Sequence, residues 1–288
     1  MAFAPAKRRS AKLRLALSGV SGSGKTYTSI QIAKLLGTKV GVIDSERKSA
    51  SLYARPEGAP EGPGSWDFAV SELDSQSPQA YLEAIKDAAR EGIDALVIDS
   101  YSHSWLRALE QVDLASSKIT GWRDTGPLVT RLVDAVLSYP GHVLCTFREK
   151  ATHEVEKNER GQISMKKVGL APVAREGMEY EFGVWLKLTA NGGLTVDKSR
   201  CDSLPVGAIY SRQDIPEMVG HLRSWLDLGA PGDDPMAEGL KAIVTATSRE
   251  ELLQVGLKLN VTITPRLTDE EKTKLRAAYA AREKEFAQ

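Results

Sequence analysis

A loop of small residues that ends in a lysine and a threonine constrains this chain more than any other feature. Residues 19–26 read G-V-S-G-S-G-K-T and match G-x-x-x-x-G-K-[ST] without gaps. In such a loop, glycines let backbone N–H groups converge on phosphates at the positive end of a helix. The position between a predicted strand and a predicted helix argues against a chance Gly/Ser-rich turn. The predicted phosphate-binding residues are Gly19, Ser21, Gly22, Ser23, Gly24, Lys25, Thr26 and Tyr27.

The chemistry of this loop predicts ATP and Mg²⁺ as its ligands. Lys25 is expected to reach the β and γ phosphates, and the Thr26 hydroxyl to ligate the metal ion. A second metal residue must be an acid, and Asp99 ends the apolar segment A-L-V-I-D. Strands of an open sheet end at the phosphate crevice, so Asp99 is predicted to lie there. The alternative is an aspartate that only caps a turn.

Hydrolysis also requires a group that aligns the attacking water. Many ATPases carry a glutamate directly after the magnesium acid, but this chain has Ser100 there. Glu46, just past the second predicted strand, is therefore the candidate general base. The alternative is a solvated turn glutamate beside Arg47 and Lys48.

Strands alternate with helices over the first half of the chain, which predicts an α/β fold with a mainly parallel sheet. Helical signals between residues 104 and 136 are expected to break near G-W-R-D-T-G-P at 121–127. Asn191-Gly192-Gly193 predicts a hairpin turn. Two capping boxes, Ser248–Glu251 and Thr268–Glu271, each predict the start of a helix.

These patterns divide the chain into four parts. We expect a basic arm at residues 1–11, a nucleotide-binding core at 12–227, a linker at 228–235 and a small helical C-terminal domain at 236–288. Lys plus Arg equals Asp plus Glu at 38 each, so overall charge gives no sign of a nucleic-acid partner. We expect no membrane association, because no apolar run reaches the roughly 18 residues of a spanning helix. The widely separated Cys145 and Cys201 fit a reducing cytoplasm.

The motifs resemble those of the RecA-like recombinase ATPases. V-I-D-S-E-R-K-S-A-S-L-Y-A is similar to the segment that carries their catalytic glutamate. G-H-V-L-C-T-F-R-E-K, V-A-R-E-G-M-E-Y-E-F and D-K-S-R-C most resemble phage-encoded RecA-like ATP-binding proteins, a group that includes single-strand-annealing recombinases. The resemblance covers roughly residues 12–227 and implies a RecA-like P-loop NTPase core.

The resemblance also implies individual roles. Glu46 becomes the catalytic base, and either Thr146 or Arg148 senses the γ-phosphate. Lys198 and Arg200 resemble a K-x-R pair that reaches the γ-phosphate of a neighbouring subunit, and residues i and i+2 of a strand share one face. A homo-oligomer with an intersubunit ATP site follows from this resemblance. The alternative for the pair is a solvated hairpin edge.

Single-stranded DNA is the partner that the resemblance implies, bound by the segment after residue 146 and aided by a single-strand-binding protein. This segment is rich in both basic and acidic residues, so the alternative is a solvated surface hairpin. The expected setting is the cytoplasm of a phage-infected or lysogenic bacterium. The main alternative function is a nucleotide-dependent switch or loader that regulates a protein in phage DNA metabolism without annealing DNA.

Overall fold

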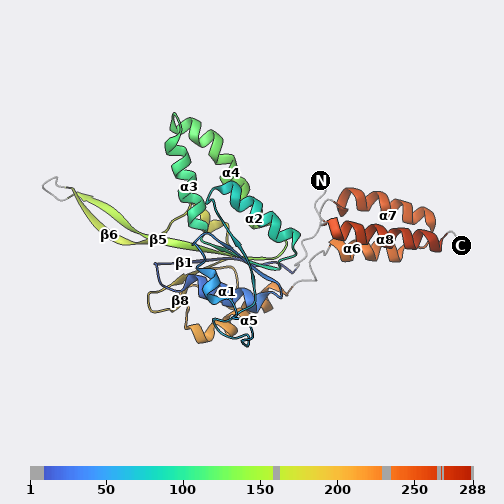
Figure 1. Ribbon diagram of the computed structural model, residues 1–288, viewed down its shortest axis with the longest axis horizontal. Helices are drawn as coiled ribbons and strands as arrows, with labels where there is room; N and C mark the ends of the chain where they lie inside the picture. Colours follow the sequence, from blue (N-terminus) through green and yellow to red (C-terminus); the bar gives the residue numbers. More distant parts are fainter. Residues whose placement is uncertain (1–9, 158–162, 229–234, 265–266, 268, 287–288) are drawn as a thin grey trace. The chain divides into compact units, whose positions relative to one another are not determined.

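The computed structural model describes residues 10–157, 163–228, 235–264, 267 and 269–286 (Figure 1). Contacts divide the chain into Lys12–Leu226 and a second unit that combines Met1–Ala11 with Asp227–Gln288. The expected arm at 1–11 and the expected linker at 228–235 fall largely outside the described residues.

The first unit is built on a nine-stranded sheet with the order β3-β2-β4-β5-β1-β7-β8-β9, and β6 pairs with β5. Pairing is parallel from β3 through β7 and antiparallel for β7–β8, β8–β9 and β5–β6. The predicted α/β class with a mainly parallel sheet is confirmed. The strands are β1 (Arg14–Gly19), β2 (Val40–Asp44), β3 (Ala69–Glu72), β4 (Ala95–Asp99), β5 (His142–Lys157), β6 (Ile163–Pro172), β7 (Val184–Leu188), β8 (Leu194–Ser199) and β9 (Ile209–Tyr210).

Helices cover both faces of this sheet, which explains why β2 and β4 are buried along their whole length and β1 is buried from Leu15 onward. β1 directs Leu15 and Leu17 into one core cluster and Ala16 into the other, as the two-residue period of a strand requires. The first cluster includes residues of α1 and α5, and the second includes residues of α2 and α4. The helices of this unit are α1 (Lys25–Leu36), α2 (Pro78–Arg90), α3 (Tyr101–Leu114), α4 (Lys118–Ser138) and α5 (Ile215–Leu226), with 3₁₀ turns η1 (Ala50–Tyr53), η2 (Met178–Tyr180) and η3 (Arg212–Asp214).

The expected helix break at residues 121–127 is wrong. The chain turns at residues 115–117, Ser117 caps α4 by accepting a hydrogen bond from the Thr120 N–H, and Pro127 lies inside the helix. Gly121 instead allows α4 to pack closely against α3. A Cβ at this position would lie 2.8 Å from both the Cα and the carbonyl oxygen of Val112 in α3. The two helices form the hairpin drawn in green in Figure 1.

Strand β5 extends beyond the sheet and forms an antiparallel hairpin with β6 that projects away from the core (Figure 1). Residues 158–162, which connect the two strands in sequence, are outside the described part. The β7–β8 hairpin turns at Asn191-Gly192-Gly193 as expected, and Gly192 adopts a φ of 79° that favours glycine.

The described residues of the second unit form the helices α6 (Pro235–Thr245), α7 (Arg249–Thr262) and α8 (Asp269–Glu285), in line with the expected helical domain. They pack around a small core that includes Ile243, Leu252 and Leu275. Ser248 caps α7 as expected, but Glu251 does not complete a capping box, since its carboxylate accepts hydrogen bonds from both the N–H and the hydroxyl of Thr247. Thr268 lies outside the described residues.

Neither unit contains, among its described residues, a helix that is both long and apolar enough to cross a membrane.

Candidate nucleotide-binding site

The predicted phosphate loop connects β1 to α1 and is closed by its own hydrogen bonds. The Ser23 hydroxyl donates to the Val20 carbonyl at 2.8 Å, and the Ser23 N–H donates to the same oxygen at 3.3 Å. Gly22 and Gly24 have φ angles of 77° and 93°, in the left-handed region that favours glycine. Gly19 must also lack a side chain, because a Cβ would lie 2.7 Å from the Ser23 Oγ. The sequence pattern therefore matches a specific backbone shape.

Lys25 folds back over this loop. Its Nζ donates to the carbonyl oxygens of Gly19 at 3.0 Å and Val20 at 2.9 Å. Burial lowers the pKa of Lys25, although the negative charges of Asp99 and Glu46 act in the opposite direction. A buried ammonium held at the mouth of a phosphate loop is suited to binding phosphate oxygens.

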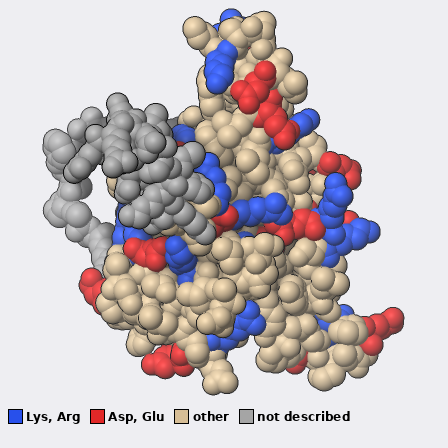
Figure 2. All heavy atoms as spheres, turned by 90° about the vertical axis from the view of Figure 1, so that its left-hand side faces the viewer, with Lys and Arg blue, Asp and Glu red and all other residues tan. Residues whose placement is uncertain are grey.

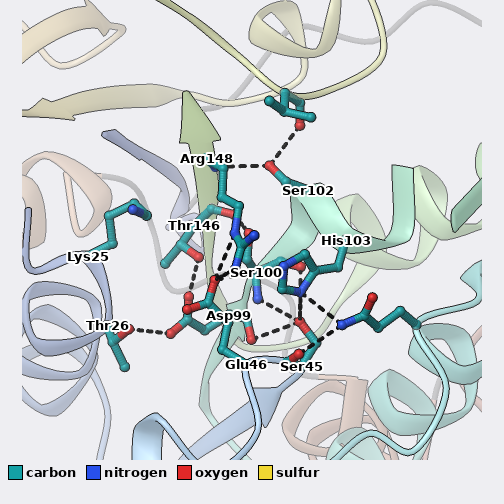
Figure 3. A network of polar contacts seen from close by, with 12 residues as sticks. Lys25, Thr26, Ser45, Glu46, Asp99, Ser100, Ser102, His103, Thr146 and Arg148 are labelled. Carbon is teal, nitrogen blue, oxygen red and sulfur yellow. Dashed lines mark hydrogen bonds and ion pairs between the residues drawn. The ribbon is translucent and has the colours of Figure 1, made fainter. Parts of the chain in front are cut away.

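The predicted metal residues meet at the carboxyl end of β4 (Figure 3). Thr26 Oγ1 donates to Asp99 Oδ2 at 2.5 Å, and the Thr146 hydroxyl donates to Asp99 Oδ1. Asp99 is only 1% exposed. Burial raises the pKa of Asp99 to about 6, even though both threonine hydroxyls favour the ionised form. The three residues come from α1, β4 and β5, which the sheet order brings together.

This donor set fits magnesium. A P-loop supplies one hydroxyl and one carboxylate, and phosphate oxygens and water complete the oxygen shell that Mg²⁺ prefers. Thr26 and Asp99 are those two groups, and a buried carboxylate with a raised pKa is one that a divalent cation would stabilise in its ionised form. Clusters of three or more His, Cys, Asp or Glu residues suited to a metal are absent from the described part of the chain, and a P-loop site needs none.

Glu46 lies at the same edge of the sheet and is paired with Arg148. Its Oε1 accepts hydrogen bonds from Arg148 Nε at 3.0 Å and Nη2 at 2.8 Å. The loop that carries Glu46 is held by Asp44, whose carboxylate accepts from the Glu46 N–H at 2.6 Å and from the Ala50 N–H at 3.0 Å. The structure thus brings the candidate base and one candidate γ-phosphate sensor into direct contact.

Both candidate sensors are therefore part of the site but have different partners. Thr146 is buried against the metal acid Asp99, whereas Arg148 is half-exposed and binds the candidate base Glu46. Arg47 and Lys48, next to Glu46, have φ angles of 56° and 70°, which is uncommon for residues with side chains and concentrates at functional sites.

A polar network beneath Glu46 was missed by the sequence reasoning. The Ser45 hydroxyl lies 2.8 Å from His103 Nδ1 and accepts the Ser100 N–H at 2.9 Å, while Gln76 Nε2 donates to the Ser45 carbonyl at 3.0 Å. His103 Nε2 lies 3.9 Å from Glu46 Oε1. Burial lowers the pKa of His103. The only signal in the sequence is the cluster of polar residues in D-S-Y-S-H-S, which does not reveal their partners.

A second carboxylate, also missed, lies beside the phosphate loop. Glu149 follows Arg148, and its side chain is 2% exposed. Its Oε1 accepts from the Ser18 hydroxyl at 3.0 Å and lies 3.4 Å from Lys187 Nζ, while its Oε2 has no hydrogen-bond partner among the described residues. Ser18 directly precedes Gly19, so this carboxylate borders the loop.

Lys198 and Arg200 lie apart from the groups just described. Lys198 Nζ donates to the Glu179 carbonyl at 2.6 Å, and Arg200 Nη2 donates to the Tyr180 carbonyl at 3.4 Å. Burial and then the charge of Arg200 lower the pKa of Lys198. The two cations therefore both contact one segment, η2, although Arg200 lies just past the end of β8. Tyr180 beside them is 72% exposed.

Fold and site together define a P-loop NTPase. Residues 11–203 match a model of the AAA domain family, and the chain belongs to that family. Family and site indicate nucleotide binding and hydrolysis, with ATP as the nucleotide and Mg²⁺ as its usual ion.

Comparison with solved structures finds similarity to a KaiC-like protein, PH0186, from the hyperthermophilic archaeon Pyrococcus horikoshii OT3. The two share 16% sequence identity with a TM-score of 0.42, over 71% of this chain and 93% of the archaeal chain. No significant match was found among curated proteins.

Proposed function

We propose that this protein is a Mg-ATP-hydrolysing RecA-like ATPase of phage DNA recombination that binds single-stranded DNA and promotes annealing. One observation carries the proposal. Strand β5 holds Thr146 and Arg148 at the nucleotide site and continues as one strand, with a register shift at Thr152/His153, into the projecting β5–β6 hairpin. A change at the phosphates can therefore be transmitted along one strand to a surface that a polymer can reach.

The side chains have separable roles in hydrolysis. Lys25 binds the terminal phosphates, and Glu46 aligns a water molecule for attack once it is released from Arg148. The guanidinium of Arg148 is then free to stabilise negative charge on the phosphate. Bound at Thr26 and Asp99, Mg²⁺ would neutralise charge on the phosphate oxygens.

The DNA-binding part of the proposal rests on the hairpin and on charge. Between residues 146 and 175 the sequence carries seven basic residues, and the side chains of 153–168 lie outside the described part. Figure 2 looks toward this end of the molecule, where Lys and Arg side chains are interspersed with Asp and Glu. Such a surface favours weak, salt-sensitive contact with a phosphate backbone over sequence-specific recognition.

The proposed assembly is a homo-oligomer in which Lys198 and Arg200 reach the nucleotide of the next subunit. Two adjacent cations next to the exposed Tyr180 support this, because their hydrogen bonds go to single carbonyl oxygens and leave donors for a phosphate. A single-strand-binding protein is the proposed partner during annealing.

The deciding experiment measures ATP turnover with and without single-stranded DNA at low salt, with particle size followed in the same samples. The proposal expects DNA to bind, to raise the turnover rate and to promote larger particles. Binding should weaken linearly on a log–log plot against salt, and duplex DNA of the same sequence serves as the control.

If single-stranded DNA neither binds nor changes turnover, the recombinase proposal fails. A nucleotide-dependent switch or loader for a protein partner then becomes the better account. A wild-type protein that does not bind ATP would overturn both proposed functions.

A further inference from the structure

An arginine near the C-terminal end of the core sequence contacts the phosphate loop. Arg212 begins η3, the 3₁₀ turn between β9 and α5, and the Ser211–Asp214 capping box fixes that turn. Its Nη2 donates to the carbonyl oxygen of Ser23, inside the loop, at 3.3 Å across 189 residues of chain. The motif that defines the loop contains no indication of this contact.

The guanidinium lies in a slot between two glycines. A Cβ on Gly24 would lie 2.3 Å from Arg212 Nη2, and a Cβ on Gly192 would lie 3.1 Å from Arg212 Nε. Gly24 belongs to the phosphate loop, and Gly192 belongs to the turn of the β7–β8 hairpin. A side chain at either position would push the arginine away, so the space is shaped for a planar cation.

An aromatic ring lies beneath this cation. The Arg212 Cζ is 5.5 Å from the centroid of Tyr27, the residue after the metal-binding Thr26. Tyr27 is itself held by Tyr53 and Trp66, with centroids 5.6 and 5.0 Å away. Because these contacts fix its ring, Tyr27 offers the guanidinium a rigid surface to pack on.

Strand order separates the two ends of the nucleotide site. Glu46 follows β2, Asp99 ends β4 and Arg148 belongs to β5, and these three strands are all on one side of β1. Arg212 and Gly192 come from the other side of β1, from β7, β8 and the chain after β9. The reacting phosphates belong on the side with the acids, so the nucleoside is left to the side with Arg212.

We propose that Arg212, backed by Tyr27, forms the base-binding end of the nucleotide site, where the nucleobase stacks on the guanidinium plane. Arginine planes are suitable surfaces for bases, and every base has a face that can stack. The site therefore holds nucleoside triphosphates, ATP and GTP among them, with little selectivity between bases. The inference rests on the proposed ATP binding and adds a residue that the sequence motifs do not indicate.

Binding measurements separate stacking from two other roles, namely support of the loop and attraction of phosphate. The titrants are ATP, GTP and inorganic tripolyphosphate, each with Mg²⁺, and the readout is the calorimetric dissociation constant. The variants are Arg212→Ala and Arg212→Lys, because lysine retains the charge and a donor but has no plane to stack. Arg223→Ala is the matched control: Arg223 donates at 3.4 Å to the Leu35 carbonyl near the other end of α1.

Stacking predicts that both Arg212 variants weaken ATP and GTP binding by about 5- to 30-fold and leave tripolyphosphate binding unchanged. Arg223→Ala should match the wild type for all three titrants. The inference is overturned if Arg212→Lys binds ATP like the wild type, if tripolyphosphate weakens as much as ATP, or if Arg212→Ala changes nothing. A wild-type protein that binds none of the three would instead refute ATP binding itself, and thermal melting confirms that each variant is folded.

Discussion

Replacing Asp99 with asparagine should make the protein more stable while it removes Mg-ATP binding. Asp99 is almost fully buried, and burial raises the pKa of its carboxyl from 3.8 to about 6. At neutral pH without magnesium, the Asp99 carboxylate is therefore a buried negative charge, and protonation would remove that charge. Asparagine removes the charge, and the hydroxyls of Thr26 and Thr146 can donate to it or accept from it.

The magnitude and its pH dependence follow from the two pKa values. Because the folded-state pKa is raised, the native state binds the proton more tightly than the unfolded state, and stability falls as pH rises from about 4 to about 6. By pH 7 the charged carboxylate lowers the free energy of unfolding by about 3 kcal/mol. For a domain of this size, removal of this charge by the Asp99→Asn substitution raises Tm by roughly 6–12 °C.

The assay is urea denaturation of wild type and Asp99→Asn, without magnesium or nucleotide, at pH 7 and pH 5. The stability difference should shrink from about 3 to about 1.5 kcal/mol, because the wild-type carboxyl is largely protonated at pH 5. Asp94→Asn, at the other end of β4, is the control. Burial acts to raise the pKa of Asp94, but hydrogen bonds from Thr38 and Lys39 outweigh it and lower the pKa, so this variant should lose stability at pH 7.

Two results would refute the reasoning. If Asp99→Asn is no more stable than wild type at pH 7, or if the difference does not shrink at pH 5, the buried charge is not the cause. Calorimetry tests the functional role by measuring the affinity of Asp99→Asn for Mg-ATP. If this affinity equals that of the wild type, Asp99 is not a metal residue.

Glu46→Gln should keep ATP binding and lose about 10²- to 10⁴-fold in turnover, whereas normal turnover would make Glu46 a surface residue. Lys25→Ala should abolish ATP binding in calorimetry, with unaltered affinity contradicting the phosphate-loop assignment. Mixing Lys25→Ala with Arg200→Ala subunits should restore part of the ATPase activity if Arg200 acts across the interface, and no recovery at any ratio argues against a shared site. Gly121→Ala should destabilise the protein by about 1–3 kcal/mol in urea titrations, because its Cβ meets the backbone of α3. Gly126→Ala, with nothing within 4 Å, is its control and should stabilise by about 0.5–1 kcal/mol.

Much of the core could be predicted because its signals are local. The phosphate loop and the capping of α7 by Ser248 each depend on residues within a few positions of one another. The helix break at 121–127 was predicted wrongly because glycine and proline often end helices but also occur inside them, as Gly121 and Pro127 do in α4. Gly121 marks close packing against α3, and only the neighbouring helix reveals it.

The sequence by itself determined that this chain has a phosphate loop and a mainly parallel α/β core, and it predicted Asp99 as the metal residue, because the loop motif and the apolar strand pattern are local signals. Only the tertiary structure decided which side chains meet. The pairing of Glu46 with Arg148 spans 102 residues, and the contact of Arg212 with Ser23 spans 189. Such contacts depend on the order and register of the strands, which place β5 and β7 on opposite sides of β1. That order is set by how the whole core packs, and no short stretch of sequence contains it.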